Sequence, residues 1–292
     1  MIVDQKGSGM AKAKTATLRS RWLGRRLREL RETSGMSIQE VGEFLQRNMG
    51  TVSRFENGIY PVRRPDMMAM LDLFGVSDSR HRENLMRLSE SVWQTGWWDG
   101  YPDEFTEFVD FIWLEAQAVG QRLFDTMLLP GLLQTERYAD AAIRAAEFDK
   151  PEEHIEQGLE VRLQRQELLD REHPPILQVL LDESVLYRQV GSAEVMRDQL
   201  THLLELSKRP NIHLRVLPFS AGAHESPEGA FKYFVMDDPY PDVVYVETPN
   251  GALYLEQTET APAAQRYDRL WGKSLKSDES AELISALIEE PS

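Results

Sequence analysis

The stretch from Leu27 to Gly58 places the tightest constraint on how this chain can fold. It reads LRELRETSGMSIQEVGEFLQRNMGTVSRFENG. Ser37 and Asn48 are residue types that cap helix N-termini, and apolar residues at helical spacing follow each of them. Only Gln46-Arg47 separates the two helical patterns. The stretch therefore predicts two short helices joined by a tight turn.

Two short helices joined in this way form a helix-turn-helix, whose second helix can enter the major groove of DNA. The residues around them resemble the lambda-repressor/Cro-type (XRE) family over about 60 residues. The resemblance rests on Leu23-Gly24, Leu27-Arg28, Leu30-Arg31, Gly35-Met36-Ser37, Val41, Leu45, Val52-Ser53 and Glu56-Asn57-Gly58. It implies an all-α DNA-binding domain, which we expect over residues 18–92, behind a flexible basic arm at 1–17.

The resemblance also implies which side chains contact double-stranded operator DNA. The candidates for reading bases lie on the second helix of the pair: Asn48, Met49, Thr51 and Arg54. The candidates for phosphate contact are Arg25, Arg28, Ser37, Gln39, Arg47, Asn57, Arg63 and Arg64, and the basic residues Lys12, Lys14 and Arg19 join them by charge.

The distribution of charge along the chain also favours DNA binding by its N-terminal part. Residues 1–80 hold 14 basic and 9 acidic residues, whereas the remainder holds 19 basic and 39 acidic residues. A basic head on an acidic body indicates that the head, and not the body, meets a polyanion.

Other classes of protein are excluded or disfavoured by composition. The chain has no cysteine, which excludes disulfides and thiolate metal sites. No apolar run approaches the roughly 18 residues of a membrane span, and no secretory signal pattern opens the chain. We expect a cytoplasmic protein, associated with the nucleoid when bound to DNA, with no membrane partner, no cofactor and no metal.

The body, residues 93–292, is predicted to be an acidic α+β domain. Helices are expected at 103–116, 135–147 and 151–171, and a further helix capped by Ser192 lies between short strands at 176–181 and 212–217. Strands at 230–236, 243–248 and 252–256 follow, the last two joined by an Asn-Gly hairpin turn. Helices at 260–275 and 278–289 close the chain. The fold class is thus helices, then a mixed sheet with a C-terminal hairpin and closing helices.

No catalytic motif appears in the body, so we expect no enzyme. A hydrolase would use His224 as base, with Glu183 or Glu228 as partner and Ser226 as nucleophile. A nuclease would combine Asp182-Glu183 with Lys232 at a metal site. Either reading makes the protein a DNA-targeted enzyme.

An aromatic cluster near the start of the body offers weak candidates for a ligand pocket, namely Trp97, Trp98 and Trp113. If these residues line a pocket, the protein is a repressor that responds to a small molecule.

The body resembles the large C-terminal domain of WhiJ-like regulators of actinomycetes. The residues that carry this resemblance are Leu129–Thr135, Tyr138-Ala139, Arg162, Arg165-Gln166, Leu181–Glu183, Val190-Gly191, Met196, Gln199-Leu200, Leu217–Phe219, Ala221-Gly222, Phe231 and Val243–Glu247. The resemblance implies an antitoxin-like transcriptional regulator, commonly paired with a small acidic protein encoded by a neighbouring gene.

We therefore expect a sequence-specific DNA-binding regulator whose body forms a homodimer and responds to a partner protein or ligand. The alternative is an antitoxin that neutralises the small neighbour-encoded protein and regulates its own synthesis through DNA binding.

Overall fold

The computed structural model describes residues 16–97, 108–249 and 251–289. The predicted arm at 1–17 therefore lies outside the described residues except for its last two positions, and Lys12, Lys14 and Trp98 lie outside them entirely. The contacts divide the chain into two compact units, Met1–Trp97 and Trp98–Ser292. Trp97 falls in the first unit. Each unit is described by itself.

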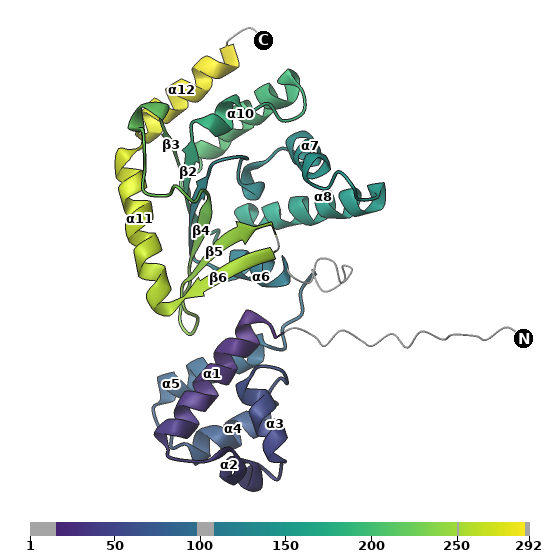
Figure 1. The fold of residues 1–292 in the computed structure, drawn as a ribbon, viewed down its shortest axis with the longest axis vertical. Coiled ribbons are helices and arrows are strands. Elements are labelled where there is room, and N and C mark those ends of the chain that lie inside the picture. Colours follow the sequence, from purple (N-terminus) through teal and green to yellow (C-terminus); the bar gives the residue numbers. More distant parts are fainter. Residues whose placement is uncertain (1–15, 98–107, 250, 290–292) are drawn as a thin grey trace, which may run out of the picture. The chain divides into compact units, whose positions relative to one another are not determined.

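The described part of the first unit is helical (Figure 1). Its helices are α1 (Leu18–Thr33), α2 (Ile38–Leu45), α3 (Met49–Glu56), α4 (Arg64–Leu73) and α5 (Ser79–Ser91). Their inward faces bury one apolar core, to which α1 contributes Leu18, Trp22, Leu23 and Leu27. Val41 of α2 and both Val52 and Phe55 of α3 are buried as well, as the helical spacing predicts.

Arg19 corrects one expectation from the sequence. The side chain is only 3% exposed, and its guanidinium Nη1 donates to the backbone oxygens of Ser91, at 2.6 Å, and Gln94, at 3.2 Å. Because this cation satisfies carbonyl groups at the end of α5, it fastens α1 to the end of that helix and is not a phosphate contact.

The second unit is built around a six-stranded mixed sheet in the order β3-β2-β1-β4-β5-β6. Its strands are β1 (Gly120–Asp125), β2 (Ile176–Asp182), β3 (Ile212–Leu217), β4 (Phe231–Val235), β5 (Val243–Thr248) and β6 (Gly251–Glu256). β1, β2 and β3 run parallel, whereas β4, β5 and β6 form an antiparallel meander that joins the sheet at β1. β1 therefore lies where the parallel and antiparallel halves meet.

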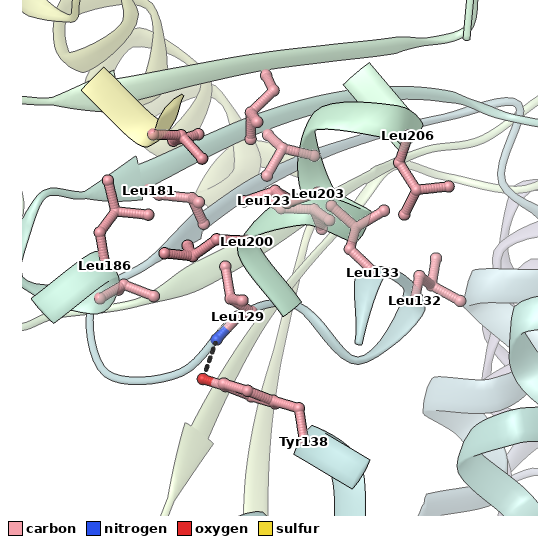
Figure 2. Close-up of a cluster of buried hydrophobic side chains, with 14 of the residues drawn as sticks. Leu123, Leu129, Leu132, Leu133, Tyr138, Leu181, Leu186, Leu200, Leu203 and Leu206 are labelled. Atoms are coloured by element: carbon pink, nitrogen blue, oxygen red, sulfur yellow. Dashed lines mark hydrogen bonds between the residues drawn. The ribbon is translucent and has the colours of Figure 1, made fainter. Parts of the chain in front are cut away.

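Helices cover both faces of this sheet (Figure 1). They are α6 (Val109–Gln117), α7 (Glu136–Ala146), α8 (Glu152–Gln166), α9 (Ser184–Tyr187), α10 (Ala193–Ser207), α11 (Thr260–Lys273) and α12 (Ser277–Glu289), with a short 3₁₀ turn at Gly131–Leu133 and another at Glu167–Asp170. On one face a leucine-rich cluster packs between the parallel strands and α7, α10 and α12 (Figure 2). On the other face, Tyr267 and Leu270 of α11 pack on Phe124 and Leu180.

The predicted fold class is confirmed: an all-α helix-turn-helix region precedes a domain with a mixed sheet, a C-terminal hairpin and closing helices. The sequence analysis missed β1, the strand at the centre of the sheet. It also extended the helix at 151–171 too far, since α8 ends at Gln166 and a 3₁₀ turn follows. The predicted helix at 103–116 is seen as α6, and its first residues lie outside the described ranges.

None of the described helices is long and apolar enough to cross a membrane.

Candidate nucleic-acid interface

The turn between α2 and α3 takes the form that the sequence predicts. Ser37 caps α2 through a reciprocal capping box with Glu40, and Asn48 caps α3 by accepting from the backbone N–H of Thr51 at 2.8 Å. Gln46 adopts the left-handed conformation, and the N–H of Arg47 donates to Gly42 O at 2.8 Å. These contacts fix the two helices as a compact helix-turn-helix.

Close backbone contact sets the angle between these helices. A Cβ on Gly42 would lie 2.9 Å from the carbonyl oxygen of Arg47, so only glycine lets the turn pass this close to α2. Gly24 does the same for α1, where a Cβ would lie 2.5 Å from the carbonyl oxygen of Glu56.

A buried ion pair holds the end of α3 against α1. Glu56 has a side chain that is 1% exposed and accepts from Arg31, with Nε–Oε1 at 2.6 Å and Nη2–Oε2 at 3.0 Å. Arg31 also donates through Nη1 to Met36 O at 2.9 Å, and hydrogen bonding to Glu56 raises the pKa of Arg31. The pair joins residues 25 positions apart and includes the loop before α2, so it orients α3 relative to the rest of the unit.

This ion pair was not predicted from the sequence, in which Arg31 and Glu56 contribute only to the family resemblance. The helical spacing puts Leu27 and Leu30 on one face, but nothing in the sequence pairs a cation on α1 with the last residue of α3.

The base-reading candidates lie at the N-cap and on the first two turns of α3. Met49 is 64% exposed, and Thr51 and Arg54 are partly exposed. The Thr51 hydroxyl donates to Asn48 Oδ1 at 3.1 Å, so these two polar side chains form one unit at the start of α3.

Arg54 is the cation of α3 that the fold leaves available. Its guanidinium lies over the ring of Tyr60, 4.7 Å from the centroid, and it makes no hydrogen bond or ion pair with the residues that the structure describes. Stacking of this kind orients a guanidinium without using its N–H donors.

The phosphate candidates divide into two groups. Arg63 is exposed at the start of α4 and has no side-chain partner in the described ranges. Three others already hold partners at the surface: Arg28 contacts Glu56 and Asn57, Arg47 pairs with Asp66, and Arg64 pairs with Glu90. Arg25 is partly exposed and, like these three, already has an interaction partner. Since exposed pairs contribute only about 0–1 kcal/mol, a phosphate can compete for Arg64 and, more weakly, for Arg47, whereas Arg28 contacts the buried carboxylate of Glu56.

The start of α2 differs from what the resemblance implies. The N–H and hydroxyl of Ser37 donate to the Glu40 carboxylate at 2.7 and 2.8 Å, and these hydrogen bonds lower the pKa of Glu40. Gln39 donates to Glu43 at 2.9 Å. A carboxylate therefore already occupies the place at the helix N-terminus where a phosphate would bind.

The aromatic candidates in the body do not share one environment. Trp113 is 0% exposed and packs edge-to-face on Tyr240, 5.0 Å between centroids, so it is part of the core of the second unit. Trp97 is partly exposed.

The residues of the two enzymatic alternatives are separated or engaged elsewhere. Ser226 donates its hydroxyl to Gly229 O at 2.7 Å, and His224 accepts from the backbone N–H of Ser226. Glu228 pairs with Arg266 at 3.0 Å, and Glu183 accepts from the N–H of Phe219 at 2.6 Å. No catalytic alignment of these side chains results.

The supposed nuclease residues lie on different faces of the sheet. Asp182 follows Leu180 by two positions, and Leu180 belongs to the α11 face. Lys232 lies between Phe231 and Tyr233 of that face and so points to the opposite one. Among the described residues no three acidic or histidine side chains are grouped to hold a metal ion.

The geometry defines a protein with a helix-turn-helix domain of the kind that DNA-binding regulators carry, and comparison of families agrees. Residues 22–84 match a helix-turn-helix domain family of XRE type. Residues 108–286, more than half of the chain, match the domain of unknown function DUF5753. The chain therefore belongs to the DUF5753 family. No curated protein and no solved structure matches it.

Proposed function

We propose that the protein is a sequence-specific transcriptional regulator of the WhiJ-like type, in which α3 reads operator DNA. The observation that carries the proposal is the state of α3. The helix is fixed at its end by the buried Arg31–Glu56 pair and presents Met49, Thr51 and the uncommitted guanidinium of Arg54 on one exposed stretch.

Each of these three side chains suits a different contact with a base. Arg54 offers the paired donors that a guanine O6/N7 edge accepts, and Thr51 offers a hydroxyl. Met49 offers an apolar contact of the sort that a thymine methyl accepts. Arg63 and the surface-paired Arg28, Arg47 and Arg64 supply phosphate contacts, which add affinity without sequence information.

We further propose that the acidic second unit is not catalytic and brings two chains together on DNA. One eight-residue α3 reads few bases, so two copies on half-sites about 34 Å apart would give the affinity that regulation needs. The unit would also receive a signal from a small ligand or a partner protein. We expect the protein to act in the cytoplasm.

Selection of bound duplexes from a random pool tests this proposal with the full-length chain. A regulator that binds as a dimer will enrich an inverted repeat with half-sites separated by about one helical turn. Enrichment of a single short site would support DNA reading and refute the dimer. A pool without enrichment after repeated rounds would refute sequence-specific binding itself.

The antitoxin alternative makes a different prediction about partners. A small acidic protein from a neighbouring gene would co-purify with this chain in a fixed ratio and would harm cells when expressed alone. Growth unaffected by the neighbour would refute the antitoxin role and leave the regulator.

A further inference from the structure

Charged side chains without ion-pair partners gather inside the second unit, where β1 meets β4. The register pairs Leu123 with Lys232 and Lys232 with Tyr245, so these side chains project from the same face of the sheet. Asp125 lies two residues beyond Leu123 and therefore projects from that face as well. Phe111 of α6 lies over this row, 4.6 Å from the Tyr245 ring and 5.1 Å from Lys232 Nζ.

Neither Asp125 nor Lys232 makes a hydrogen-bonded ion pair with a described residue, although the two charges lie within electrostatic range of each other and Glu247 lies within range of Asp125. Asp125 Oδ2 is shielded from solvent and has no hydrogen-bond partner among the described residues. Lys232 makes no hydrogen-bonded ion pair with them, and its Nζ lies over the Phe111 ring, 5.1 Å from the centroid. Burial raises the pKa of Asp125, while the charge of Lys232 opposes this rise.

Arg162 of α8 adds a second cation from the layer above the sheet. Its Nη1 donates to Gln134 Oε1 at 2.8 Å, and burial together with the neighbouring Arg165 lowers its pKa to about 10. Arg165 itself is neutralised by Glu115, at 2.7 Å and 2.9 Å, whereas Arg162 makes no hydrogen-bonded ion pair with a described residue and lies within electrostatic range of Glu115 and Glu247.

Tyr138 lies near both Arg162 and the end of β1. Its hydroxyl accepts from the N–H of Leu129 at 3.3 Å, as Figure 2 shows, and it lies within electrostatic range of both Asp125 and Arg162. Asp125, Arg162 and Lys232 are each partly buried, and Asp125 Oδ2 itself is shielded from solvent.

Partly buried charges without hydrogen-bonded partners lower the stability of a fold unless a bound molecule supplies those partners. Buried polar groups are paired in nearly all native structures, and exceptions tend to mark functional sites. The second unit has about twice as many acidic as basic residues, so cations without a hydrogen-bonded carboxylate partner are unexpected there.

We propose that Asp125, Arg162 and Lys232 bind a small anionic metabolite that also carries a hydrogen-bond donor. A carboxylate or phosphate group would contact Lys232 and Arg162, and a hydroxyl or amine would donate to Asp125 Oδ2. The rings of Phe111 and Tyr245 would contact its carbon skeleton. This proposal rests on the proposed function, because the metabolite would be the signal that the regulator receives.

Thermal unfolding of the full-length protein with chosen anions tests the site. The probes are citrate and glycerol 3-phosphate, which combine an anion with hydroxyl groups, and inorganic phosphate, all compared with sodium chloride at equal ionic strength. At ten times its dissociation constant a ligand should raise the Tm by about 3–6 °C. Lys232→Met should abolish the rise, and Lys208→Met, which removes the exposed lysine that follows α10, should retain it.

A second variant distinguishes a binding site from a structural ion cluster. Asp125→Asn removes a charge that the fold leaves unpaired, so it should raise the Tm in the absence of probe and weaken the response to each anion. If Asp125→Asn and Lys232→Met both lower the Tm without probe, the cluster is structural and the proposal is overturned. An equal rise in all variants, or no rise with any probe, also overturns it.

Operator binding by the same samples keeps this test apart from the proposed function. DNA binding by a protein that fails to respond to the anions would overturn the site and leave the regulator. An anion response that depends on Lys232, in a protein without specific DNA binding, would support the site and refute the regulator.

Discussion

Removing the Glu56 carboxylate should destabilise the helix-turn-helix unit more than removing any exposed acid from it. In Glu56→Ala, two of the guanidinium N–H groups of Arg31 lose their acceptor, while the bond from Nη1 to Met36 O and the long bond from Nη2 to Glu32 Oε1, at 3.4 Å, remain. The arginine is 11% exposed, so water cannot replace the carboxylate fully.

The magnitude follows from the geometry of the pair. Breaking a buried ion pair costs about 3–5 kcal/mol because the remaining charge is left without a partner. Since one edge of Arg31 reaches solvent and Glu32 still contacts it, we expect a cost below this range, about 2–3 kcal/mol. That corresponds to an equilibrium for unfolding of the unit that shifts by about 30- to 150-fold.

Amide hydrogen exchange of peptides from residues 18–91 measures this shift separately from the second unit. Glu32→Ala is the matched control, because Glu32 also contacts Arg31, at 3.4 Å, but is 61% exposed. We expect Glu32→Ala to change exchange by less than about fivefold, as exposed pairs contribute about 0–1 kcal/mol. Equal effects of the two variants would refute the assignment of Arg31–Glu56 as the contact that holds α3. In the Arg31→Met, Glu56→Ala double variant, part of the protection should return because no unpaired charge remains.

Three further predictions concern single contacts. Glu40→Ala should weaken the capping box of α2. The pKa of Glu40 in the folded state is lowered from its ordinary value of 4.5. The wild type should therefore exceed the variant in stability by the full amount above pH 4.5, and this difference should disappear as the pH falls through the folded pKa. Thermal unfolding at several pH values measures the difference, and one that persists in acid would contradict this prediction. Gly24→Ala should destabilise the first unit by about 1–3 kcal/mol in a denaturant titration, because the added Cβ would meet the Glu56 carbonyl. In the control Gly272→Ala, in α11, the added Cβ meets nothing, so this variant should be neutral or more stable in the same titration. Ser280→Ala should cost about 1–3 kcal/mol, because the buried N–H of Val216 on edge strand β3 donates to the Ser280 hydroxyl at 3.0 Å, while Ser285→Ala, whose hydroxyl bonds only within α12, should change stability little.

The sequence predicts the helix-turn-helix well because its determinants are local. Ser37, Gly42 and Asn48 act on neighbours within a few residues, so capping and close backbone approach can be read from their spacing. The hairpin around Asn-Gly was placed for the same reason, with β5 and β6 ending within one residue of their predicted bounds.

The central strand β1 could not be found in this way. Its sequence Gly-Gln-Arg-Leu-Phe-Asp carries polar residues whose placement depends on the distant chain. Gln121 is buried and donates to Glu115 O at 3.2 Å, and Arg122 lies over the rings of Tyr233 and Tyr267. Tertiary contacts thus overrule the local pattern.

The candidate site was predictable only in part for the same physical reason. The exposed positions Met49, Thr51 and Arg54 follow from helical periodicity, and they lie on α3 as expected. That Arg19 is buried, or that Glu40 occupies the helix N-terminus where a phosphate was expected, depends on partners that charge counting does not reveal.

The measurement that tests the central claim most directly is fluorescence anisotropy of full-length protein with DNA from the region upstream of its own gene and with a scrambled duplex, at two salt concentrations. We expect tighter binding to the upstream duplex, weakened by salt. Arg54→Met should lose about 1–3 kcal/mol of the preference for that duplex, whereas Arg209→Met, which removes a cation of the second unit, should retain it. Equal affinity of the wild type for both duplexes, or an Arg54→Met variant that keeps the full preference, would contradict the claim that α3 reads DNA.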